Sequence, residues 1–169
     1  MDIRFAVLTV SDRSSRGERA DASGPALIEI IKARGWSVAH QEILPDDLLL
    51  LQETLSTWSD RGDVDVILTT GGTGFAPRDV TPEATHGVIE REAPGLAEAM
   101  RAASLLKSPH AMLSRAVAGI RGKVLIVNLP GSPKGAVENL QVVLPALEHA
   151  VKLLHDAPDA EAGHNPQTA

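Results

Sequence analysis

The sequence contains no cysteine and few aromatic side chains: two phenylalanines, two tryptophans and no tyrosine among 169 residues. The lack of cysteine excludes a disulfide framework and a thiolate metal site, and it is compatible with a cytoplasmic enzyme. The scarcity of aromatic rings argues against binding of single-stranded nucleic acid, which usually stacks its bases on such rings. The net charge of −6 argues the same way, because nucleic-acid backbones are bound by basic surfaces.

No apolar run approaches the roughly 18 residues that a membrane span requires, so no membrane partner is expected. Asp2 and Arg4 precede the first apolar stretch and no small-residue cleavage site follows it, which indicates a buried strand rather than a signal peptide. The hydrophobic fraction of 43% is typical of a globular chain. We expect one domain over residues 1–156 and a flexible C-terminal tail over 157–169, because the tail has little to bury.

Four apolar, β-favouring segments alternate with helical patterns along the chain. The strands are expected at 3–11, 36–44, 64–70 and 123–129, and the helices begin near residues 23, 45, 81, 96 and 132. Ser23 is the expected cap of the first helix, and Pro145 is expected to kink or split the last one. Residues 12–22 have a loop-like polar composition, and 107–122 form an irregular segment. This order predicts an α/β fold with three layers: a mostly parallel sheet with helices on both faces.

Ligands of such sheets bind beyond the carboxyl ends of the strands. Four candidate segments follow the predicted strands directly, and they should therefore meet at one edge of the sheet. These segments are Ser11-Asp12, Pro45-Asp46, the glycine-rich stretch after residue 70, and 128–132.

Residues 69–85 read TTGGTGFAPRDVTPEAT, with three glycines in four positions. Glycines let backbone N–H groups approach an anion, because no Cβ stands in the way, and a phosphate is the natural ligand. A tight strand-to-helix turn without a ligand is the alternative. The stretch lacks the lysine of a Walker loop, and Pro77 replaces the last glycine of a dinucleotide fingerprint. The residues expected to hold phosphate are Thr70, Gly71, Gly72, Thr73 and Gly74.

Asp79 follows this loop closely, and a carboxylate beside a phosphate would repel it unless a cation lies between them. Mg²⁺ is typically held by one or two carboxylates together with substrate phosphates. Asp46 can supply the second carboxylate from the neighbouring strand end. A helix cap or a favourable dipole contact in the first turn is the alternative for each acid.

Other polar groups near the strand ends carry weaker signals. Asp12 can bind a ligand or cap a turn, and Ser132 can line a site or cap the last helix. Asn128 lies beside Ser132 in the same segment, and Ser114-Arg115 could bind an anion or nothing. The six histidines show no compact pair at a spacing typical of metal ligands.

The stretch TTGGTGFAPRDVTPEAT resembles the signature of the molybdopterin adenylyltransferases, the family of the gephyrin G-domain and of MogA. Further segments match in order and extend the resemblance over roughly residues 4–156: LTVSDR, ILPDD, IEREAPG, MLSR, GIRGK, NLPGSPKG and LPALEHAVKLL. Thr73 and the Arg78-Asp79 pair distinguish the sequence from the molybdenum-insertion and competence-damage protein domains, which share the fold.

The resemblance implies a MogA-like fold and transfer of AMP from ATP to the terminal phosphate of molybdopterin, with Mg²⁺ and release of pyrophosphate. By the family pattern, Asp46 and Asp79 would be the catalytic residues and metal ligands. The glycine loop from Thr70 to Gly74 would cradle phosphate. The residues that would line the nucleotide or pterin site are Ser11, Asp12, Asn128, Pro130, Gly131 and Ser132. Ser114 and Arg115 would face the pterin side.

The resemblance also implies a homotrimer. Eukaryotic relatives carry a fused molybdenum-insertion domain, whereas this sequence ends soon after its last predicted helix, so we expect a separate insertion enzyme to receive the product. Two other functions stay open. One is a catalytically silent module that binds molybdopterin or scaffolds other proteins, which the pair Asp46 and Asp79 disfavours. The other is an unrelated nucleotide hydrolase, which the missing Walker lysine disfavours.

Overall fold

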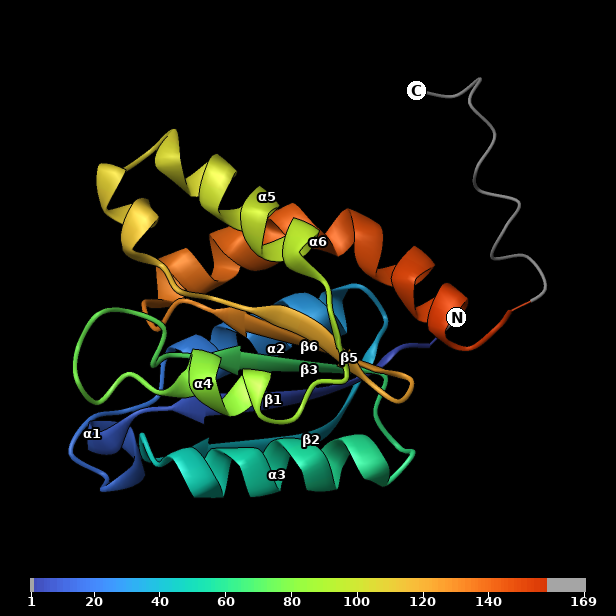
Figure 1. Ribbon diagram of the computed structural model, residues 1–169, viewed down its shortest axis with the longest axis horizontal. Coiled ribbons are helices and arrows are strands. Elements are labelled where there is room, and N and C mark those ends of the chain that lie inside the picture. Colours follow the sequence, from blue (N-terminus) through green and yellow to red (C-terminus); the bar gives the residue numbers. More distant parts are fainter. Residues whose placement is uncertain (1, 158–169) are drawn as a thin grey trace.

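The computed structural model describes residues 2–157, so the predicted tail lies, from residue 158 on, outside the described residues. The chain forms one six-stranded sheet flanked by helices (Figure 1). The strands are β1 (Arg4–Val10), β2 (Ser37–Leu44), β3 (Val66–Thr70), β4 (Arg91–Glu92), β5 (Ala118–Arg121) and β6 (Val124–Leu129). The helices are α1 (Asp12–Ser15), α2 (Ser23–Ala33), α3 (Leu48–Asp60), α4 (Thr81–His86), α5 (Pro94–Leu105), the 3-10 helix η1 (Pro109–Leu113) and α6 (Pro133–Leu154).

The strand order is β2-β1-β3-β6-β5-β4, and the first four of these strands run parallel. The prediction of a mostly parallel sheet is confirmed. The antiparallel edge formed by β5 and β4 was not predicted. Strand β4 has only two residues, and β5 has four with a glycine at its second position. Neither is long enough to show the alternation of apolar residues that predicts a strand. The helix expected from residue 81 towards Pro94 ends at His86, which leaves room for β4.

Side chains of the central strands alternate between two hydrophobic cores, one on each face of the sheet. In β1, Phe5 and Val7 face the core that is covered by α2, α5 and α6, whereas Ala6 and Leu8 face the core under α3 and α4. Figure 1 shows these helices on opposite sides of the sheet. Strands that are buried on both faces explain the near-continuous apolar runs of the sequence, and the predicted three layers are confirmed.

One prediction about a helix start was wrong. Ser23 does not cap α2; instead Asp21 accepts hydrogen bonds from the Gly24 N–H (3.1 Å) and from the Ser23 hydroxyl (3.4 Å). Helix α6 is not split at Pro145 and continues as one element to Leu154. No helix within residues 2–157 has the length and apolar character needed to cross a membrane.

Asn128 joins three elements at the carboxyl end of β6 and is fully buried. Its amide nitrogen donates to the hydroxyls of Thr69 (2.9 Å) and Thr85 (2.8 Å), and its amide oxygen accepts from the Val117 N–H (3.2 Å). The side chain thus ties β3, α4 and the chain entering β5 to one point.

We predict that Asn128→Ala lowers the free energy of unfolding by about 2–4 kcal/mol, because it leaves several buried polar groups without a partner. Urea unfolding measures this loss. A variant that unfolds at the same urea concentration as the wild type but no longer binds ligand would instead assign Asn128 to ligand binding.

Candidate functional site

The carboxyl ends of the four parallel strands surround a cavity of about 330 Å³. Each strand contributes through the loop that follows it: Ser11 after β1, Asp46 after β2, Gly71 after β3 and Gly131 after β6. The structure therefore brings together all four segments that the sequence places at strand ends. The cavity is lined by Thr9, Val10, Ser11, Ser14, Arg19, Ala20, Asp21, Ala22, Ser23, Asp46, Thr70, Gly71, Gly72, Asp79, Gly131, Ser132 and Pro133.

Two glycines of the loop after β3 are required by the local backbone. Gly71 has φ of 108°, and a Cβ there would lie 2.2 Å from the Val10 carbonyl oxygen. Gly72 has φ of 64°, and a Cβ there would lie 2.4 Å from the Thr81 hydroxyl and 2.8 Å from a carboxylate oxygen of Asp46. Close packing of the loop against β1 and Asp46 thus accounts for both glycines, and the same packing holds the loop at the cavity wall.

Asp46 and Asp12 are locked together by reciprocal hydrogen bonds between their loops. The Asp12 N–H donates to the Asp46 carboxylate, and the Asp46 N–H donates to the Asp12 carboxylate, each at 3.1 Å. Arg78 binds the same Asp12 carboxylate with two donors, at 2.7 and 2.9 Å, and holds its pKa below the ordinary value. Asp12 does not line the cavity itself, but its hydrogen bonds orient Asp46, which does.

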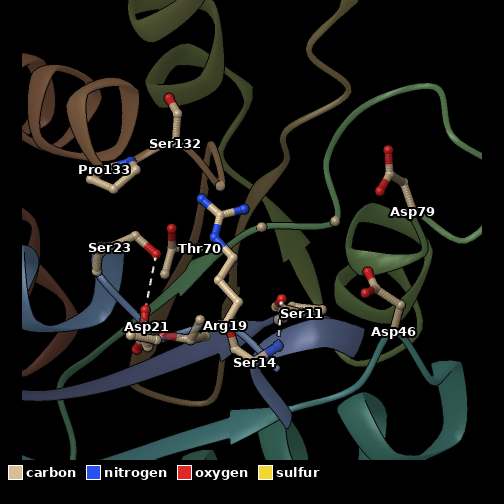
Figure 2. A pocket seen from close by; sticks show the side chains of 17 residues that line it. Ser11, Ser14, Arg19, Asp21, Ser23, Asp46, Thr70, Asp79, Ser132 and Pro133 are labelled. Atoms are coloured by element: carbon tan, nitrogen blue, oxygen red, sulfur yellow. Dashed lines mark hydrogen bonds between the residues drawn. The ribbon is translucent and has the colours of Figure 1, made fainter. Parts of the chain in front are cut away.

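The carboxylates of Asp46 and Asp79 lie on the same side of the cavity (Figure 2). Burial raises the pKa of Asp46, and repulsion from Asp12 and Asp79 adds to the effect. A bound cation would relieve this repulsion. Within residues 2–157, no group of three or more His, Asp or Glu side chains is arranged to hold a metal. Two carboxylates fit a Mg²⁺ site whose other oxygen ligands are water and substrate phosphates.

Among residues 2–157, Arg19 is the single basic residue that lines this cavity, and sequence reasoning missed it. Figure 2 shows its guanidinium between Asp21 and Ser23 on one side and Asp46 and Asp79 on the other. Within the described residues it makes no hydrogen bond or ion pair, so its five donors are available to a ligand. Nothing in the polar stretch 12–22 distinguishes Arg19 from the other arginines there.

The hydroxyl groups that line the cavity differ in what they can offer a ligand. Thr70 donates its proton to the Pro130 carbonyl oxygen (2.7 Å), so only its lone pairs remain. Ser11 caps α1 and Ser132 caps α6, each by accepting a backbone N–H. Because both serines act as acceptors in these caps, their hydroxyl protons are available to donate to an anion.

A second cavity, of about 350 Å³, adjoins the first at Ser132, which lines both. The loop after β3 forms part of its wall through Thr73 and Gly74, and Ser114 and Pro130 line it as well. Sequence reasoning missed the remaining polar residues, because they come from α5, η1, the turn between these two and α6 rather than from strand ends. These residues are Arg101, Ser104, Lys107, Ser108, His110, Glu138 and Asn139.

Three of the predicted site residues, Asp12, Asn128 and Arg115, line neither of these two cavities. Asp12 makes the contacts with Asp46 and Arg78 described above. Asn128 makes the buried contacts described above. The Arg115 guanidinium donates to the carbonyl oxygens of Gly74 (2.8 Å) and Asp79 (2.7 Å). It also pairs with Glu83.

The chain is similar to several known proteins in sequence and in fold. A family model described as a "probable molybdopterin binding domain" matches residues 6–149. A molybdopterin adenylyltransferase of Helicobacter pylori is 44% identical over 154 residues, which cover 90% of this chain and 88% of that protein. The crystal structure of the molybdopterin biosynthesis enzyme MoaB from Thermus thermophilus matches with a TM-score of 0.87 and 52% identity, covering 92% of this chain and 98% of that one.

Gephyrin of Dictyostelium discoideum is 46% identical over 162 residues. The match covers 90% of this chain but only 22% of gephyrin. The chain thus spans less than a quarter of that relative, and it spans most of the bacterial one.

The raised pKa of Asp46 has a consequence for stability. A carboxyl whose folded pKa lies above its unfolded value favours the folded state below the ordinary value of 3.8, and this contribution is lost as the pH rises through the folded pKa. At neutral pH the charged Asp46 therefore destabilises the ligand-free protein.

We predict that Asp46→Asn raises the melting temperature at pH 7.5, without metal or nucleotide, by roughly 1–3 °C, and that the gain disappears near pH 3.5. Thermal unfolding followed by circular dichroism measures this shift. Asp47→Asn is the matched control, because Asp47 only caps α3 and asparagine caps equally well. A lower melting temperature for Asp46→Asn at pH 7.5 would contradict the electrostatic account.

Proposed function

The chain belongs to the molybdopterin-binding domain family, and we propose that it is a molybdopterin adenylyltransferase. In the reaction, an oxygen of the terminal phosphate of molybdopterin forms a bond to the α-phosphorus of ATP. The bond from that phosphorus to the oxygen bridging the α- and β-phosphates breaks. Pyrophosphate leaves with the bonding electrons, and the products are adenylylated molybdopterin and pyrophosphate.

The observation that carries the proposal is the convergence of Asp46 and Asp79 beside the glycine loop, in a cavity that also contains Arg19. A protein that only bound an anion would gain nothing from two acidic groups at that place. The similarity to the molybdopterin adenylyltransferases of Helicobacter pylori and Escherichia coli supports the same reaction.

The reaction needs no strong general base. The attacking phosphate is already anionic near neutral pH, because the second pKa of a phosphate monoester is about 6. The residues therefore have to position two phosphates and stabilise the charge that develops on the leaving pyrophosphate. Ser11, Ser132 and Arg19 supply donors for this purpose.

Asp46 and Asp79 would hold a Mg²⁺ ion together with phosphate oxygens. The ion would neutralise negative charge on the triphosphate when it is bound. Asp12 contributes indirectly, since its hydrogen bonds with Asp46 fix the position of that carboxylate.

We assign the nucleotide to the cavity with the paired acids and the pterin to the adjoining one. The second cavity has hydroxyl, amide and cationic groups that suit a polar ring system with a phosphate, including Ser114, Asn139 and Lys107. Ser132 lines both cavities, so phosphates bound in the two cavities would approach each other near this residue. As the family resemblance suggests, we further propose a cytoplasmic homotrimer that passes its product to a molybdenum-insertion enzyme.

We predict that the protein releases pyrophosphate from ATP and Mg²⁺ only when molybdopterin is present. Asp79→Asn should lower the turnover number about 100-fold or more, because it removes a carboxylate that compensates transition-state charge through the metal, and it should change nucleotide affinity far less. Asp47→Asn serves as the control. Pyrophosphate release without molybdopterin, or at an unchanged rate in Asp79→Asn, would refute the proposal. Binding of both substrates without turnover would indicate a silent binding module.

We predict that Arg19 recognises the β- and γ-phosphates. Arg19→Ala should weaken ATP binding about tenfold, the scale of one hydrogen-bonded charge pair, and should leave AMP binding unchanged. Calorimetric titration with each nucleotide measures the difference. Arg16→Ala is the matched control, since Arg16 lies in the same loop, pairs with Glu18 and does not line the cavity. An equal loss of affinity for ATP and for AMP would show that Arg19 contacts a part of the nucleotide that both share.

A further inference from the structure

Arg115 contacts both ends of an exposed loop that carries one of the paired acids. The loop runs from Thr73 to Asp79, and the four residues 75–78 within it are exposed, including Phe75 at 68%. The backbone N–H of Arg115 donates to the Thr73 carbonyl oxygen (2.9 Å). Its guanidinium donates to Gly74 at one end of the loop and to Asp79 at the other. One residue thus satisfies three loop carbonyls.

The rest of the loop is held by few contacts. Asp79 and Ala76 close a turn through two hydrogen bonds. The Asp79 N–H donates to the Ala76 carbonyl oxygen (2.9 Å), and the Asp79 carboxylate accepts from the Ala76 N–H (3.0 Å). At the outer side, Arg78 reaches Asp12. The position of this turn relative to the cavity therefore depends on two sets of contacts, the Arg78–Asp12 pair and those of Arg115. Arg115 anchors the turn to α4 through its pair with Glu83.

We propose that Arg115 is a positioning residue that holds the loop so that the Asp79 carboxylate faces the nucleotide cavity. This inference rests on the proposed function, and it replaces direct contact of Arg115 with the pterin, which the family resemblance implies. The planar guanidinium suits the role, because its fixed donors reach two carbonyls and a carboxylate at once, whereas a lysine cannot span them.

The placement of Arg115 also connects the two cavities. Ser114, its neighbour in the chain, lines the second cavity together with Thr73 and Gly74. Asp79 lines the first. A shift of the segment around residue 114 would therefore move the anchor on which Asp79 depends.

Hydrogen exchange in the ligand-free protein tests whether Arg115 holds the loop from Thr73 to Asp79. In Arg115→Met and Arg115→Lys, the amides of residues 73–80 should exchange at least about tenfold faster than in the wild type, while the strands keep their protection. Urea unfolding checks that the variants are folded. Arg121→Met is the matched control, because Arg121 similarly links Asp60 to the Val88 carbonyl oxygen, away from this loop. Unchanged exchange in Arg115→Met would overturn the inference, whatever the reaction proves to be.

Metal affinity and substrate kinetics give the second test. With a non-hydrolysable ATP analogue present, the affinity for Mn²⁺, measured by electron paramagnetic resonance, should fall about 10–100-fold in Arg115→Met and remain unchanged in Arg121→Met. The KM for molybdopterin should change little. A higher KM with unchanged Mn²⁺ affinity would show direct pterin contact and overturn the inference. A wild type that turns over no molybdopterin would refute the proposed function, and the exchange measurement would still decide the role of Arg115.

Discussion

The parallel pairing of β2, β1, β3 and β6 is the constraint on which the site depends. Parallel strands point their carboxyl ends to one edge, so four loops that are distant in the sequence must begin side by side. The contacts across this edge are short and specific. Asp46 and Asp12 exchange backbone-to-carboxylate hydrogen bonds, and Gly71 lies against the Val10 carbonyl oxygen. The register of the strands therefore places the paired acids before any ligand is present.

The electrostatics of the cavity are unfavourable in the ligand-free protein and become favourable only with a ligand. In the described part of the chain, three carboxylates and one guanidinium line it. One of the carboxylates, Asp21, already accepts hydrogen bonds from Thr9 and Gly24. Asp46 has a raised pKa because it is buried near other acids. A cation with a polyanionic substrate compensates these charges. The protein retains an arrangement that weakens its own stability, which is typical of functional sites.

The sequence predicts the part of the fold and site that repeats a regular pattern. Apolar runs identify the buried strands, and the residues directly after them, such as Asp46, follow from the parallel topology. Arg19 could not be predicted, because no periodicity fixes the path of the loop that carries it. The structural roles of Arg115 and Asn128 could not be predicted either, because their partners are backbone and hydroxyl groups that are remote in the sequence. Strand β5 pairs with β6 and β4 pairs with β5, so both short strands depend on tertiary pairing rather than on local propensity.

The most direct test of the central claim is the position of a metal in a crystal grown with Mn²⁺ and a non-hydrolysable ATP analogue. The account predicts an anomalous scattering peak within coordination distance of a carboxylate oxygen from Asp46, one from Asp79 and at least one phosphate oxygen. A metal bound away from both carboxylates, or a triphosphate bound outside the cavity formed by the four strand ends, would contradict it.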